Sequence, residues 1–166
     1  MIKPLNFTCK EKLPYLLKLK KGDKFQTIRK AWKKEKYHDL PYDGEGYSEG
    51  QIDNYTKTEL VDKPPTYKVG DTVPMIWDRD SKNTKLGKIK ITDIDLIEIS
   101  KDEKGFWITS PDGSLFMPGY YGYEKNVKCL ALADGFDSVE KFFKYFDDNY
   151  DISTPKKFWV YRGEVL

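Results

Sequence analysis

The chain has 166 residues, of which 39% are hydrophobic and 15% aromatic, so it can build one good core and is too short for two independent domains. It contains no apolar run long enough to cross a bilayer, and its first residues lack the apolar stretch of a secretory signal, which predicts a cytoplasmic protein without a membrane partner. Cys9 and Cys129 show no paired spacing, which favours reduced thiols.

The formal charge of +2 is distributed unevenly along the chain. Residues 10–36 hold eleven Lys or Arg and three acidic residues, a net charge of +8, which leaves −6 for the remainder. Clustered cations attract phosphates through the release of counterions, so this third of the chain suggests an anionic partner. A solvated basic surface is the alternative.

The first elements form around a short leucine-rich segment. Residues 5–8 are expected to form a short strand, and Pro14 suits the first turn of a helix that Gly22 would close as its C-terminal cap. Residues 27–32 are expected to be extended. If the chain runs extended after Gly22, alternation points Lys24 and Gln26 to one side and Phe25, Thr27 and Arg29 to the other.

Residues 33–65 have many turn residues and no apolar period, so we expect a long loop inserted into the domain. Long loops in compact domains are usually functional or disordered. This loop is therefore either a lid over the site or a segment that is only mobile.

The second half of the chain alternates strand and helix patterns. The helix after Asp137 has the clearest pattern, with Asp137 and Glu140 as a capping pair and an apolar stripe that belongs to the core. Together the elements predict one α+β domain over residues 1–166, built on a small β-barrel with a few flanking helices. The other expected elements are strands at 69–77, 89–99 and 158–161, a hairpin at 105–117 around Pro111–Gly113, and a helix at 123–133.

The segment Gly22-Asp23-Lys24-Phe25-Gln26-Thr27-Ile28-Arg29 fits the pattern G-x-K-x-x-T-x-R. Four further blocks follow in order: Lys-Val-Gly-Asp at 68–71, a strand at 86–94, Asp-Gly-Phe before a helix at 134–136, and an aromatic strand at 158–161. In these blocks the chain resembles the ASCH family of the PUA-like barrel superfamily. The resemblance implies a PUA-like barrel whose cleft binds RNA or a modified nucleoside.

The same resemblance implies candidate catalytic residues, because some bacterial ASCH proteins are amidohydrolases acting on N4-acylated cytidines. It points to Lys24 and Thr27 with Asp134 as the downstream acid, where the family has Glu. A lysine can activate a threonine hydroxyl when desolvation and nearby cations lower its pKa. Asp134 is one methylene shorter than Glu, and a misplacement of roughly 1 Å can cost about 100-fold in rate. Whether the chain is an enzyme stays open.

In the binding interpretation, the same groups contact a ligand without chemistry. Lys24 and Arg29 would meet phosphate, Thr27 a base edge or sugar, and aromatic rings an unpaired base. A purely structural alternative has Lys24 and Asp134 as an ion pair and Thr27 bonded to backbone. The other candidate RNA-binding residues are Lys21, Gly22, Gln26, Trp32 and Trp77.

Several common sites are excluded. His38 is the only histidine, so Ser-His-Asp and Cys-His catalysis lack a well-placed base, and one His with two distant Cys cannot hold a structural zinc. No nucleotide-binding glycine motif is present. We expect no metal and no cofactor. The leading hypothesis is binding of RNA or a modified nucleoside, with an amidohydrolase or a ribonuclease as alternatives, and it requires Lys24, Thr27, Arg29 and Asp134 to surround one hollow.

Overall fold

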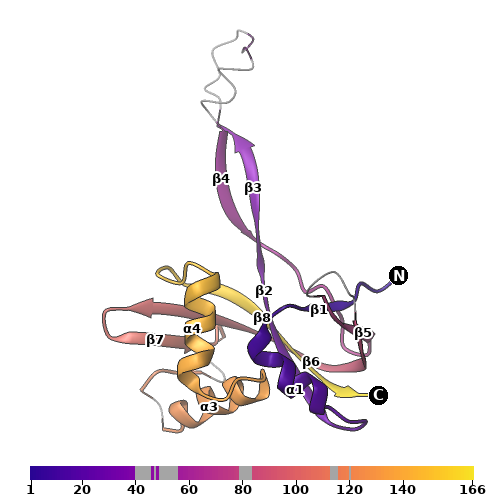
Figure 1. Cartoon of the computed structure of the whole chain (residues 1–166). Helices are drawn as coiled ribbons and strands as arrows, with labels where there is room; N and C mark the ends of the chain where they lie inside the picture. Colours follow the sequence, from indigo (N-terminus) through magenta and orange to yellow (C-terminus); the bar gives the residue numbers. More distant parts are fainter. Residues whose placement is uncertain (40–45, 47, 49–55, 79–83, 113–115, 120) are drawn as a thin grey trace.

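The computed structural model describes residues 1–39, 46, 48, 56–78, 84–112, 116–119 and 121–166 (Figure 1). It is an α+β structure made mostly of strands, with three short α-helices and one 3-10 helix in the described residues. In chain order the elements are β1 (Leu5–Phe7), η1 (Lys10–Lys12), α1 (Leu13–Lys18), β2 (Lys24–Lys30), β3 (Trp32–His38), β4 (Thr56–Asp62), β5 (Thr72–Trp77), β6 (Thr84–Asp102), β7 (Gly105–Thr109), α3 (Tyr123–Ala133), α4 (Val139–Asn149) and β8 (Lys156–Val165).

The main sheet has six strands in the order β1-β5-β6-β8-β2, with β7 paired to β6. Among the described residues β2 pairs only with β8 and β1 only with β5, so the sheet is open and the predicted closed barrel is not found. The physical reason lies at the free edge of β2, where the backbone N–H of Ile28 donates to a carboxylate at the end of α3 and not to another strand.

Strands β6 and β8 form the centre of the sheet. The prediction of one long strand over 89–99 is confirmed, since β6 runs for 19 residues and pairs with β5, β7 and β8 in turn. Its register against β8 shifts between Ile91 and Asp93. Gly163 lies opposite this shift, and a Cβ there would come within 2.6 Å of the Lys90 carbonyl oxygen. A glycine is therefore required where the two central strands approach each other.

Two hydrophobic clusters lie on opposite sides of the sheet. One joins the sheet to α3 and α4 and contains the predicted stripe of α4, including Phe142, Phe143 and Phe146. The predicted helix is confirmed, but its cap differs. The helix begins at Val139 and Ser138 Oγ accepts from the Lys141 backbone N–H at 3.2 Å, because Ser138 is the extended residue that precedes the helix.

The prediction of a long loop over 33–65 is wrong for two stretches of it. β3 and β4 form an antiparallel two-stranded ribbon, which we call the arm, with Trp32 opposite Asp62 and His38 opposite Thr56. The arm stands away from the rest of the molecule (Figure 1). Both its faces are largely exposed, so it carries no apolar alternation by which its strands could be recognised. The predicted lid falls largely on residues 40–55, most of which lie outside the described residues.

Two turn predictions also change. α1 ends at Lys18, so Gly22 is not its cap; Gly22 instead adopts a φ of +87° in the turn before β2, where its N–H donates to the Val165 carbonyl at 2.7 Å. β7 pairs with β6, and residues 113–115 of the predicted hairpin lie outside the described residues. None of the helices in the described part of the chain combines the length and apolar character needed to span a bilayer.

Candidate functional site

The Asp-Gly-Phe block ends helix α3 in a way that fixes Asp134 against β2. The Gly135 N–H donates to the Leu132 carbonyl at 3.0 Å and the Phe136 N–H to the Ala131 carbonyl at 3.1 Å, the Schellman arrangement. Gly135 has a φ of +91°, and a Cβ on it would lie 2.8 Å from the Tyr15 ring. The glycine therefore holds the preceding carboxylate in a buried position.

Asp134 pairs with Lys12, and this corrects the predicted pair with Lys24. Lys12 Nζ lies 2.6 Å from Asp134 Oδ2, and the two side chains are 7% and 0% exposed. Asp134 Oδ1 accepts the Ile28 backbone N–H at 3.0 Å. Burial raises the pKa of the Asp134 carboxyl, and the Lys12 ammonium opposes that rise. The carboxylate thus closes the free edge of β2, a structural task.

Lys24, at the first position of β2, is exposed to solvent. Its side chain is 80% exposed and its Nζ lies 2.9 Å from Glu164 Oε2, directly across from it on β8. The Lys24 ammonium in turn lowers the pKa of the Glu164 carboxyl. A lysine that activates a nucleophile needs a desolvated position, which this one lacks.

Thr27 and Arg29 lie on the side of β2 that faces away from Gln26. Thr27 is 1% exposed, and its Oγ1 has no hydrogen-bond partner among the described residues. Arg29 Nη2 donates to the Asn6 carbonyl at 2.7 Å, and its guanidinium carbon lies 4.9 Å from the centre of the Phe7 ring. The structure therefore does not bring Lys24, Thr27, Arg29 and Asp134 around one hollow.

A pocket of about 500 Å³, the Lys24 pocket, opens at the start of β2. Its wall holds a connected polar group: Gln26 Nε2 donates to the Leu130 carbonyl at 3.1 Å, and Arg162 Nε donates to Gln26 Oε1 at 3.3 Å. Arg162 also pairs with Asp93 at 2.6 Å and with Asp95. Both cations that line this pocket are therefore matched by carboxylates. Its lining also includes Thr92, Phe116, Asn126, Cys129 and Ala133.

A second pocket of about 410 Å³, the Arg29 pocket, lies at the end of β2. Of the described residues that line it, four are cationic, none is acidic and three are tyrosines. Thr66 N–H donates to the Tyr161 hydroxyl at 2.8 Å, and the Tyr67 hydroxyl donates to the Pro4 carbonyl at 3.2 Å, so both rings are held in place. Burial raises the pKa of Tyr67 and of Tyr161, and the Arg29 guanidinium opposes the rise. The cations are Lys3, Arg29, Lys30 and Lys63, and the tyrosines are Tyr67, Tyr150 and Tyr161.

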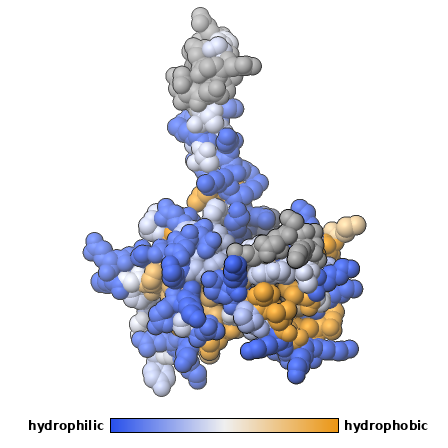
Figure 2. Space-filling view, in the orientation of Figure 1, coloured by the Kyte–Doolittle hydropathy of each residue, from blue (hydrophilic) through white to orange (hydrophobic). Residues whose placement is uncertain are grey.

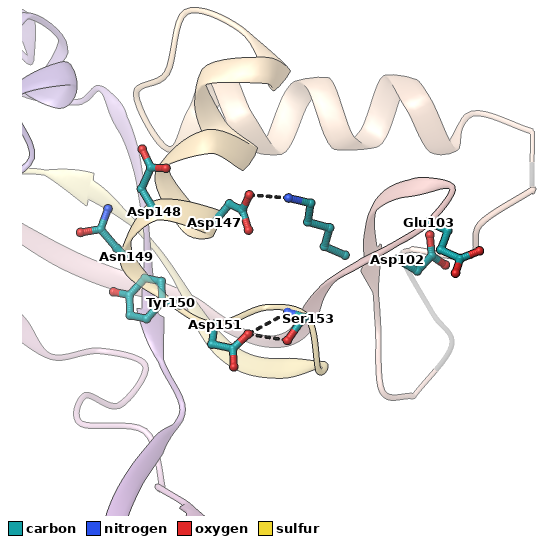
Figure 3. Close-up of a pocket in the computed structure, with 9 residues that line it drawn as sticks. Asp102, Glu103, Asp147, Asp148, Asn149, Tyr150, Asp151 and Ser153 are labelled. Carbon is teal, nitrogen blue, oxygen red and sulfur yellow. Dashed lines mark hydrogen bonds and ion pairs between the residues drawn. The ribbon is translucent and has the colours of Figure 1, made fainter.

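A third pocket of about 720 Å³, the acidic pocket, has the opposite charge (Figure 3). It is lined by Lys101 and five carboxylate side chains, and Lys101 Nζ lies 2.7 Å from Asp147. Tyr150 lines both this pocket and the Arg29 pocket, so the two adjoin. Within the described residues no three His, Cys, Asp or Glu side chains are grouped to hold a metal ion. The carboxylates are Asp102, Glu103, Asp147, Asp148 and Asp151.

No protein-family model, curated protein or solved structure matches the chain.

The other predicted binding residues fall in different places. Trp32 packs edge-on against Tyr150, with ring centres 6.2 Å apart, and the Lys30 ammonium lies 5.1 Å from its ring. Trp77, at the end of β5, packs against the second hydrophobic cluster. Lys21 and Gly22 lie in the turn before β2. Neither tryptophan is among the residues that line the Lys24 and Arg29 pockets.

Sequence reasoning missed two groups of site residues. Lys12 lies within the basic segment, but nothing local distinguishes it from its neighbours, since its partner is 122 positions away. Tyr67, Tyr150 and Tyr161 come from distant parts of the chain and meet only at the end of β2. The one signal that could have found them is the high aromatic content of the chain.

Proposed function

We propose that this protein binds single-stranded RNA and that the Arg29 pocket holds an unpaired nucleotide. The observation that carries the proposal is the composition of the pocket, four cations and three tyrosines without a carboxylate among its described lining residues. Cationic side chains contact phosphate, and aromatic rings stack on unpaired bases. The pocket volume of about 410 Å³ suits a small ligand.

Arg29 supplies the strongest recognition group. Its Nη2 is fixed on the Asn6 carbonyl and its plane lies over Phe7, so the guanidinium is already oriented. Its Nε is buried without a hydrogen-bond partner in the described part of the chain. An atom buried in this way is not open to a ligand, so phosphate would be met by the remaining N–H groups of the guanidinium. Arginine is favoured for phosphate recognition because its guanidinium presents several donors in one fixed plane.

The test is fluorescence anisotropy with a labelled oligouridine over a range of salt concentrations. Affinity should fall steeply as salt rises, and the slope reports the number of phosphate contacts. Arg29→Gln and Lys30→Gln should each weaken binding about tenfold, since each removes a phosphate contact. The matched control is Lys21→Gln with Lys24→Gln, which removes two exposed charges at the other end of β2. A flat salt response, or an equal loss in the control, would overturn the proposal.

A second candidate is binding of an uncharged modified nucleoside in the Lys24 pocket. The favouring observation is that Lys24 and Arg162 are each matched by carboxylates there, in a volume of about 500 Å³. Hydrogen-bonding groups beside an apolar floor suit a neutral heterocycle. Thr27 is not among the lining residues and Asp134 is held by Lys12, so this candidate is binding without hydrolysis.

Cys129 offers a direct reporter for this second candidate. It is exposed and lines the Lys24 pocket, whereas burial and the Glu11 carboxylate raise the pKa of the Cys9 thiol to about 11. N4-acetylcytidine should therefore slow iodoacetamide labelling of Cys129 at pH 8, with uninhibited labelling of the denatured chain as the control. Unchanged labelling at millimolar ligand would rule this candidate out, and release of acetate would show hydrolysis after all.

A further inference from the structure

The arm formed by β3 and β4 lacks any evident task within the body of the protein. Its strands are seven residues each, about 23 Å long, and they are mostly exposed. Figure 1 shows the arm standing free, and Figure 2 shows that its surface is mainly hydrophilic. An isolated two-stranded ribbon is at best marginally stable in water. A binding partner along the arm would account for its retention.

The two faces of the arm differ in how their charges are matched. On one face Lys33 pairs with Glu35, Lys57 pairs with Asp39, and the Tyr37 hydroxyl donates to Glu59 at 2.9 Å. Both lysines of this face are therefore neutralised within the arm.

The other face, here called the basic face, carries Lys34 and Lys36 with Thr58 and Leu60 across from them on β4. No carboxylate of the described residues lies within ion-pair distance of either lysine. Both ammonium groups are thus available to an external anion.

The basic face leads directly into the Arg29 pocket. Trp32 shares the alternation of Lys34 and Lys36, so it lies on the same face at the base of the arm. Its ring contacts Tyr150 and the Lys30 ammonium, and both of these residues line the Arg29 pocket. Asp62 lies across from Trp32 on this face, but Lys157 Nζ pairs with it at 2.9 Å, so a ligand in the pocket can continue onto the arm.

The Arg29 pocket and the basic face differ in their chemistry, which indicates that they bind different parts of one ligand. Beyond Trp32 the basic face has no Phe, Tyr or Trp, and the His38 ring is engaged by Thr56 Oγ1 at 2.9 Å. Lysines and threonines contact phosphates but give no platform on which bases stack. A paired RNA stem is bound mostly through its phosphates and 2′-hydroxyls across a wide, shallow minor groove, without bases stacking on the protein. The arm therefore suits a paired stem better than a single strand.

We infer that the basic face of the arm binds the phosphates of a paired RNA stem adjoining the unpaired nucleotide in the Arg29 pocket. This inference rests on the proposed RNA binding and specifies its substrate class. The acidic pocket on the other side of Tyr150 repels phosphate, which directs the stem along the arm and not across α4.

The experiment compares two RNAs, a labelled oligouridine and the same oligouridine joined to a stem of paired G and C. The unmodified protein should bind the stem RNA about tenfold more tightly, because two further phosphate contacts form. K34Q/K36Q should lose this gain, lower the salt slope for the stem RNA by about two, and leave single-strand affinity unchanged. The matched control K33Q/K57Q removes the same charge from the neutralised face and should keep the gain. Circular dichroism of both variants checks that the fold is intact.

The outcomes separate this inference from the proposed function. If the single strand binds through Arg29 but the stem adds nothing, or if both double variants lose the gain equally, the arm inference is overturned and the proposed function stands. If the unmodified protein binds neither RNA, both are overturned.

Discussion

The two ends of strand β2 come from the same basic segment, yet the tertiary structure neutralises the charge at one end and leaves the other end positive. At its start Lys24 lies across from Glu164 of β8, which neutralises it. At its end Arg29 and Lys30 lie across from Trp159 and Phe158, which cannot. The comparison teaches that the capacity of a basic segment to bind an anion depends on the residues paired with it as much as on its own charge.

The largest expected effect is a loss of stability from breaking the buried pair of Lys12 and Asp134. This carboxylate accepts the Ile28 N–H, between the two ends of β2. Lys12→Met should destabilise the fold by about 3–5 kcal/mol, because it leaves the Asp134 carboxylate buried without its cation. Lys24→Met, which breaks the exposed pair at the start of β2, should leave the urea midpoint unchanged. Equal midpoints for the two variants would show that the edge of β2 does not depend on this carboxylate.

The next largest effect is a difference in reactivity between the two thiols, Cys9 and Cys129. Cys129 lines the Lys24 pocket, so its labelling reports on the start of β2 alone. With a pKa raised to about 11 by burial, Cys9 has a thiolate fraction of about one in a thousand at pH 8. Its labelling should rise as pH approaches 11, whereas the exposed Cys129 beside the Lys24 pocket should label at pH 8. Mass spectrometry of digested protein after timed iodoacetamide treatment measures both sites. Rapid labelling of Cys9 at pH 8 would contradict its burial.

Reversing the charge of Lys30 should neutralise Arg29 at the end of β2, as Glu164 neutralises Lys24 at the start. Lys30→Glu places a carboxylate beside Arg29 and should weaken oligouridine binding at least tenfold, since it adds repulsion to the lost contact. The same reversal at Lys21, in the turn at the other end, should have a much smaller effect. Anisotropy titrations at matched salt concentrations decide the matter, and similar losses would indicate diffuse attraction to the whole basic segment.

The smallest expected effect is a change in RNA affinity when Lys24, at the start of β2, loses its carboxylate partner. Glu164→Gln removes the partner of Lys24, and RNA affinity should rise less than about twofold because Lys24 is exposed and does not line the Arg29 pocket, so it adds only screened attraction. A large gain would mean that the start of β2 also belongs to the RNA site. The salt slope measured with the same oligouridine distinguishes the two results.

Local periodicity made much of the fold predictable. The stripe of Phe142, Phe143 and Phe146 predicted the α4 helix, and the apolar alternation after Ile89 predicted the long strand β6, because buried positions in a helix and a strand repeat with fixed periods. The arm was missed since both of its faces are exposed and polar, which removes that period.

The sequence by itself determined the helices and strands that carry an apolar period, such as α4 and β6, but not the polar strands of the arm. Only the tertiary structure decided that Asp134 pairs with Lys12 and, among the described residues, that the sheet stays open and that cations are matched by carboxylates at one end of β2 and not at the other. The physical reason is range: hydrophobic period acts over a few residues, whereas ion pairing and pocket composition depend on groups that meet only when β2, β8 and the end of α3 come together.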